Sequence, residues 1–164
     1  MDKKELQNPA LYTNRELSWL LFNKRVLSEA RDKQLLLFER LKFLSITASN
    51  LDEFFMVRIG SLVDMIHAEY TKKDIAGMSA KEQLDALMEE THKFAALQYS
   101  TYNRMLLPQL RANGLNFVEH HEQLTERQAQ YVDEYFEENV YPVLTPMAVD
   151  SSRPFPLIRN KTLN

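Results

Sequence analysis

Apolar residues recur at spacings of three and four along most of the first 112 residues, and this spacing predicts helices with one buried face. Residues 1–12 lack the pattern and are predicted to form a loose leader. The first helix is predicted to start at Thr13-Asn14-Arg15-Glu16, a capping box in which Thr13 is the cap. The buried face of this helix carries Trp19, Phe22, Val26 and Ala30.

A polar segment, Thr47 to Asn50, separates the next two predicted helices. The helix before it runs from about Leu35 to Leu44, and the helix after it starts near Asn50 and continues to about Tyr70. Asparagine is among the strongest helix caps, so the residues alone favour Asn50 as the cap of the second helix. An exposed amide at a helix start is also suited to contact a nucleotide base, and both interpretations stay open. The apolar stripe of this helix is Leu51, Phe54, Phe55, Ile59, Leu62 and Ile66.

The longest helical pattern follows a predicted loop that contains Gly77. Ser79-Ala80-Lys81-Glu82 is a second capping box and marks the start of this helix. Pro108 is predicted to kink or end it, and Asn113-Gly114 supplies a terminator. The predicted inner face carries Leu84, Leu87, Thr91, Phe94, Gln98 and Met105.

The pattern changes after Gly114. Residues 115–118 predict a short strand, and Thr125-Glu126-Arg127-Gln128 caps one more helix. Residues 140–149 then read as a β-rich segment that Pro142 and Pro146 interrupt, with at most one or two strands to follow. Two or three strands at a chain end leave unpaired edges, so we expect the chain to be a fragment cut inside a second domain. The predicted domains are a helical one, 1–112, and the beginning of a second, 113–164.

Composition narrows the class of protein. The chain has 164 residues, of which 45% are hydrophobic and 26% charged, as in a soluble globular protein. The net charge of −3 argues against general nucleic-acid binding. No cysteine is present, which excludes disulfides, thiolate metal sites and cysteine nucleophiles. The sequence shows neither a secretory signal nor a transmembrane segment, which predicts a cytoplasmic protein. Peripheral association with the inner membrane stays open.

Candidate catalytic and metal-binding side chains are sparse. His67 and His92 stand alone on predicted helices, and His120-His121 lies in a predicted loop. None of them has the spacing that metal sites use, so no metal ligand is predicted in this chain. Arg153 and Arg159 flank a proline-rich segment and are interpreted as surface arginines, with the lining of a phosphate-rich channel after assembly as the alternative.

Three segments carry a resemblance to a known family. They are NRELSWLLFNKRVLSEA at 14–30, ERLKFLSITASNLDEFFMVRIGSL at 39–62 and VYPVLTPMAVDSSRPFPLIRN at 140–160. Together they resemble the N-terminal part of the polyphosphate kinases that work through a phosphohistidine. The second and third segments are specific, because they combine aromatic, polar and proline positions that generic helices do not share.

The resemblance implies a fold, a reaction and partners. Members of the family have a helical N-terminal domain and a mixed α/β head domain, which predicts a mainly α chain: a helical domain followed by the start of the head domain. They transfer the terminal phosphate of ATP reversibly to polyphosphate and use magnesium. The head domain is associated with homodimers, which predicts a homodimer or higher homo-oligomer. The catalytic histidine, its helper and the magnesium-associated arginines fall outside the matching segments, so this chain is predicted to hold no catalytic residue and to be inactive alone.

The resemblance also implies two ATP contacts. The asparagine of the family's SNLDEF-like motif contacts ATP and falls on Asn50, and an aromatic residue associated with the adenine ring falls on Phe43. An amide offers a donor and an acceptor, which complement the amine and the adjacent ring nitrogen of adenine. For Phe43, a core position in a leucine-rich helix is the competing interpretation. The competing function is a non-enzymatic helical module that docks a partner on its apolar helix faces.

Overall fold

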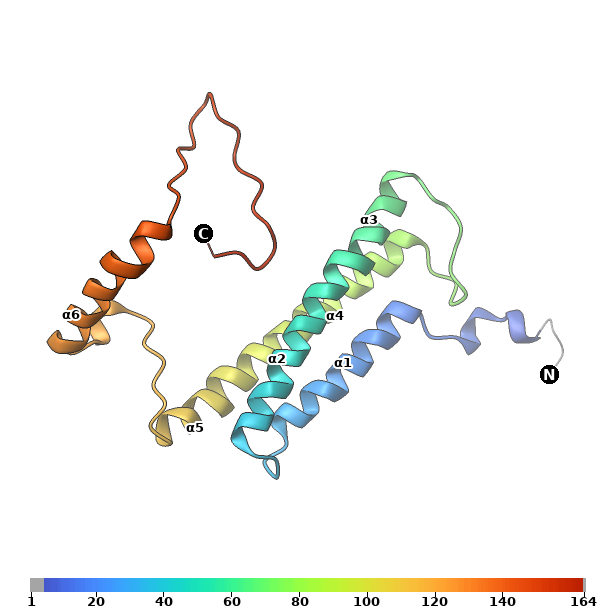
Figure 1. Ribbon diagram of the computed structural model, residues 1–164. Helices are drawn as coiled ribbons and strands as arrows, with labels where there is room; N and C mark the ends of the chain where they lie inside the picture. Colours follow the sequence, from blue (N-terminus) through green and yellow to red (C-terminus); the bar gives the residue numbers. More distant parts are fainter. Residues whose placement is uncertain (1–4, 164) are drawn as a thin grey trace. The chain divides into compact units, whose positions relative to one another are not determined.

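The computed structural model describes residues 5–163, and it divides the chain into two units, Met1–Asn116 and Phe117–Asn164 (Figure 1). The first unit is a bundle in which α1 (Arg15–Arg31) packs against α2 (Leu37–Phe54) and α4 (Ala80–Thr101). Before the bundle, residues 5–11 form two short 3-10 turns, Glu5–Gln7 and Pro9–Leu11. The predicted leader is therefore partly ordered, and its first four residues lie outside the described part. The mainly helical fold class is confirmed.

The cap of α1 is Asn14 rather than the predicted Thr13. The Oδ1 atom of Asn14 accepts hydrogen bonds from the backbone N–H groups of Glu16 and Leu17, both at 3.0 Å. Its Nδ2 donates to Asp74 at 2.7 Å and to Gln83 at 2.9 Å, and the side chain is only 3% exposed. An amide can cap a helix and donate to other elements at once, which a threonine hydroxyl does less well. Asn14 thereby ties the start of α1 to the loop before α4 and to α4 itself.

The predicted break between two helices at Thr47–Asn50 is wrong. Helix α2 continues through this segment, and a turn of π-helix, η3 (Phe55–Ile59), joins it to α3 (Gly60–His67). Thr47 is fully buried, and its hydroxyl donates to the carbonyl oxygen of Leu44 at 2.7 Å within the helix. Polar side chains can stand inside a helix when such partners satisfy them. Asn50 therefore lies inside a helix and caps none.

Helix α4 begins as predicted, with the reciprocal hydrogen bonds of the capping box between Ser79 and Glu82. Pro108 does not end the helical rod, since a π-turn, η4 (Tyr102–Leu106), precedes it and α5 (Leu107–Ala112) carries it in its first turn. Proline is tolerated there because its missing N–H is not needed at a helix start. The rod ends at Gly114, whose φ of +81° is the left-handed conformation that favours glycine.

Two clusters of apolar side chains hold the bundle together. Each cluster combines residues of α1, the α2–α3 rod and the α4–α5 rod. The first contains Leu20, Phe54, Ile59, Leu62, Ala80 and Leu87. The second contains Leu27, Ala30, Leu44, Phe94 and Leu106.

An ion pair links α1 to α4. The Lys24 Nζ lies 2.6 Å from a carboxylate oxygen of Glu90, whose other oxygen lies 2.9 Å from Lys93 Nζ. Hydrogen bonds from Lys24 and then from Lys93 lower the pKa of Glu90 to about 2. A carboxylate with a depressed pKa stabilises the fold above its unfolded-state pKa, and this contribution is lost as the pH falls toward the folded-state value.

We therefore expect Glu90→Gln to destabilise the bundle by about 1 kcal/mol or less at pH 7, because the pair is partly exposed to water. The difference from the wild type should shrink as the pH falls from 4.5 to about 2, the interval between the ordinary and the lowered pKa. Urea unfolding of both proteins across this pH interval measures the difference in their free energies of unfolding. A difference that stays constant down to pH 2 would contradict the assignment.

The second unit contains α6 (Glu126–Tyr135), followed by the π-turn η6 (Phe136–Val140) and the 3-10 turn η7 (Tyr141–Val143). The capping box at Thr125 and Gln128 is confirmed. The strands predicted at 115–118 and 140–149 are wrong, since the described residues form no strand and a lone bridge joins Asp150 to Arg153. A strand needs a partner, and no described residue of this unit is buried.

Candidate functional site

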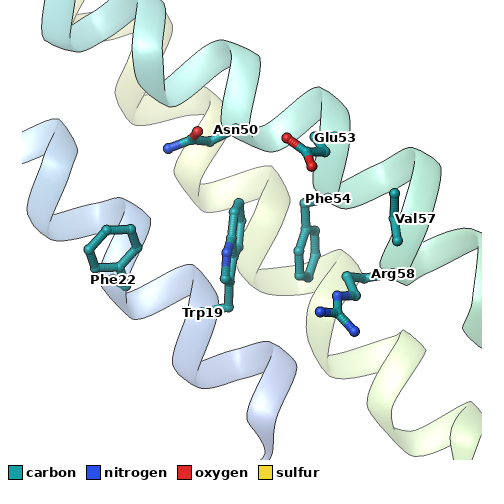
Figure 2. A pocket seen from close by; sticks show the side chains of 7 residues that line it. All are labelled: Trp19, Phe22, Asn50, Glu53, Phe54, Val57 and Arg58. Atoms are coloured by element: carbon teal, nitrogen blue, oxygen red, sulfur yellow. The ribbon is translucent and has the colours of Figure 1, made fainter.

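A pocket of about 240 Å³ opens between α1 and the α2–η3 rod (Figure 2). Helix α1 contributes two aromatic side chains, and the rod contributes one face of side chains at positions i, i+3, i+4, i+7 and i+8. This spacing places them on the same side of a continuous helix. The lining residues are Trp19, Phe22, Asn50, Glu53, Phe54, Val57 and Arg58.

Aromatic rings form the apolar surface of the pocket. Trp19 stacks on Phe54 with ring centroids 4.5 Å apart and an angle of 10° between the planes. Phe54 is buried, and Trp19 is half-buried, so Trp19 packs against the core and also faces the pocket. Phe22 was predicted on the buried face of α1 but is 56% exposed. The pocket thus offers flat apolar surfaces that water can reach.

Asn50 contributes the amide of the pocket and is held by a buried network. Its Nδ2 donates to Oδ1 of Asn23 at 3.0 Å, and Asn23 Nδ2 donates to the backbone carbonyl of Thr47 at 3.2 Å. Gln98 in turn donates to the Thr47 hydroxyl at 3.0 Å. Asn23 and Thr47 are both fully buried, whereas Asn50 is half-buried. In Figure 2 the nitrogen of Asn50 points toward α1.

Two charged side chains of opposite sign complete the lining. Glu53 is exposed on the same helical face as Asn50, one turn further along. Glu53 lies within α2 and not in the first turn of a helix. Arg58 lies at the other end of the row, and its Nε is 3.9 Å from a carboxylate oxygen of Glu16. That distance and the exposure of Arg58 leave its guanidinium able to approach an anion.

Phe43 lies outside this pocket. It belongs to α2, is half-buried, and packs against the second core cluster, beside Leu44. Seven residues place it on the same side of the helix as Asn50 but roughly 10 Å away along the axis. Trp19, Phe22 and Phe54, not Phe43, are the aromatic residues that line the pocket with Asn50.

The histidines of the chain do not form a site. The imidazole of His92 lies 2.8 Å from the backbone oxygen of Met88, and His121 lies 3.1 Å from Asp133. Within residues 5–163 no group of three or more His, Asp or Glu side chains could hold a metal ion. None of the described helices is long and apolar enough to cross a membrane.

Two models of one protein family match most of the chain. The family model of the polyphosphate kinase N-terminal domain matches residues 12–118, and that of the polyphosphate kinase middle domain matches residues 127–164. The chain belongs to the polyphosphate kinase family. The resemblance seen in the sequence is thus confirmed.

Individual polyphosphate kinases are similar to this chain in sequence and in structure. A polyphosphate kinase of Lactiplantibacillus plantarum is 53% identical over 153 residues, which are 93% of this chain and 21% of that protein. A polyphosphate kinase of Bacillus anthracis is 47% identical over 97% of this chain and 23% of its own length. The crystal structure of polyphosphate kinase from Porphyromonas gingivalis superposes with a TM-score of 0.70 at 31% identity, covering 90% of this chain and 20% of that one. The chain therefore spans about a fifth of the length of the relatives that it matches.

The sequence pointed to Asn50 but missed Phe22 and Arg58 as its neighbours. The available signal was the row of Asn50, Glu53 and Arg58 at helical spacing, which falls within the helix predicted from Asn50 to about Tyr70. The sequence did not show that the aromatic positions of α1 lie next to this row.

Proposed function

We propose that this chain is the part of a polyphosphate kinase that binds the base of ATP, in the pocket that Asn50 shares with Trp19 and Phe22. The observation that carries the proposal is the pairing of an oriented amide with aromatic rings in one pocket. Stacking of a base on an aromatic ring contributes about 1–3 kcal/mol, and an amide can pair with the amine and the adjacent nitrogen of adenine.

The size of the pocket fits this role. At about 240 Å³ it is smaller than the roughly 300–1,000 Å³ of typical ligand sites. We therefore expect it to take the base of a nucleotide, with the phosphates extending beyond it. Arg58 provides a cation at one end of the lining. The adenine contact of Phe43 stays a prediction and requires the ligand to reach two turns along α2.

The reaction proposed for the whole protein is reversible transfer of the γ-phosphate of ATP to a histidine and from there to polyphosphate. Positioning and charge neutralisation provide most of the catalysis in phosphoryl transfer. The histidine, and the residues that bind magnesium, would lie outside this chain, which contributes positioning of the base. We further propose a homo-oligomer in the cytoplasm, with ATP, ADP and polyphosphate as ligands.

A comparison of the kinase activity of a full-length protein with that of this chain alone tests whether the reacting residues lie outside the chain. A full-length polyphosphate kinase that carries this chain should transfer label from γ-phosphate-labelled ATP to polyphosphate in a magnesium buffer. The 164-residue chain alone should transfer none above background. Polyphosphate synthesis by the purified chain would contradict the proposal that the reacting residues lie elsewhere.

A further inference from the structure

The buried residue Asn23 fixes the orientation of the Asn50 amide. Asn23 is 0% exposed on α1, and both ends of its amide have partners on α2. The partner at one end is the Thr47 backbone oxygen, 3.2 Å away, which can only accept a hydrogen bond. The Nδ2 group of Asn23 must therefore face Thr47, and its Oδ1 must face Asn50.

The same reasoning fixes Asn50. Because Asn23 presents an acceptor, Asn50 must offer a donor, and its Nδ2 lies 3.0 Å from that oxygen. A flipped Asn50 would set two acceptor oxygens against each other and leave the buried Oδ1 of Asn23 without a donor, which is costly. Asn50 is thus left with its Oδ1 and one remaining N–H for a ligand, and no described residue donates to that Oδ1.

We propose that Asn23 is a specificity-determining residue that selects adenine over guanine by locking the orientation of Asn50. This inference rests on the proposed function, since it assumes that Asn50 contacts the base. Adenine carries an amine donor at position 6, where guanine carries an oxygen acceptor, and both have an acceptor at N7. The locked Oδ1 of Asn50 can accept from the adenine amine, whereas guanine in the same pose would place O6 against it.

Without the hydrogen bond to Asn23, the Asn50 amide could form a hydrogen bond with either base. A free asparagine side chain rotates by half a turn and exchanges its donor and acceptor, so Asn50 could then donate to guanine O6. The discrimination between the bases therefore depends on a residue that touches neither of them. Asn23 is a positioning residue whose effect should appear in the ratio of two affinities.

The test measures the dissociation constants of ATP and GTP for a full-length polyphosphate kinase that carries this chain. The wild type should bind ATP more tightly than GTP. Asn23→Leu has a similar shape but no acceptor, and it should narrow the ratio of the two constants roughly tenfold. Asn23→Ala removes the same acceptor and replaces Asn23→Leu if that variant does not fold.

A matched control separates specificity from stability. Gln98 donates to the Thr47 hydroxyl in the same network but contacts neither amide, so Gln98→Leu should lower the melting temperature and keep the ratio. Equal affinity of the wild type for both nucleotides, or an unchanged ratio in Asn23→Leu or Asn23→Ala, would overturn the inference. Asn50→Ala separates a failure of the proposed function from a failure of the inference about Asn23. If this variant binds ATP as the wild type does, the proposed function itself fails. If it weakens ATP while Asn23→Leu keeps the ratio, only the role of Asn23 fails.

Discussion

Replacement of Phe94 by alanine should lower the free energy of unfolding of the bundle by about 3–5 kcal/mol, the usual cost of truncating a buried aromatic ring. Phe94 is 0% exposed at the centre of the second core cluster, where side chains of α1 and α2 meet α4. The surrounding structure relaxes only partly around a truncated core side chain, so part of the cavity should stay open. Urea unfolding followed by circular dichroism measures the loss.

Leu97→Ala is the matched control on the same helix, because Leu97 is 36% exposed and lies outside both clusters. Its cost should be about 1 kcal/mol or less, as at most partly exposed positions. Equal losses for the two variants would show that Phe94 is not the centre of the packing.

Replacement of Asn50 by alanine should raise the Michaelis constant for ATP about tenfold in a full-length polyphosphate kinase that carries this chain. The variant loses the hydrogen bonds to the base, each worth about 0.5–1.5 kcal/mol. The turnover number should change less, since the reacting phosphate lies far from the base. Steady-state kinetics with varied ATP at saturating polyphosphate give the Michaelis constant and the turnover number separately.

Stability has to be followed in the same variant. Asn50→Ala also leaves the buried Oδ1 of Asn23 without its donor, so a modest loss of stability is expected. Ser49→Ala changes the neighbouring exposed residue, which does not line the pocket, and should alter neither quantity. An unchanged Michaelis constant for ATP in Asn50→Ala would contradict a contact between this residue and the nucleotide.

The sequence predicted the elements that depend on local signals. The capping boxes at Ser79 and Thr125 and the stop at Gly114 follow from hydrogen bonds and backbone conformations that involve only neighbouring residues. The apolar spacing of α4 likewise predicted Leu87 and Phe94 in the core, and that of α1 predicted Ala30. Contacts with distant parts of the chain have little influence on such features.

The sequence-based predictions were wrong where contacts with residues far away in the chain determine the structure. Thr47 and Asn50 resemble a helix boundary, but Asn23 on α1 and Gln98 on α4 satisfy their polar groups and keep the helix continuous. For the same reason, the sequence could find Asn50 by motif but not the pocket, whose other wall comes from α1. The short strands after Gly114 were predicted from composition, and no described neighbour pairs with them.

The central claim is that the base of ATP lies in the pocket of Asn50, and photo-crosslinking tests it most directly. A full-length polyphosphate kinase that carries this chain is irradiated with ATP that bears a photoreactive azide on its adenine, and the labelled peptides are identified by mass spectrometry. We expect label on the pocket segments 19–22 and 50–58, and excess unmodified ATP should suppress it. Label confined to peptides outside both segments, and equally suppressed by ATP, would contradict the claim.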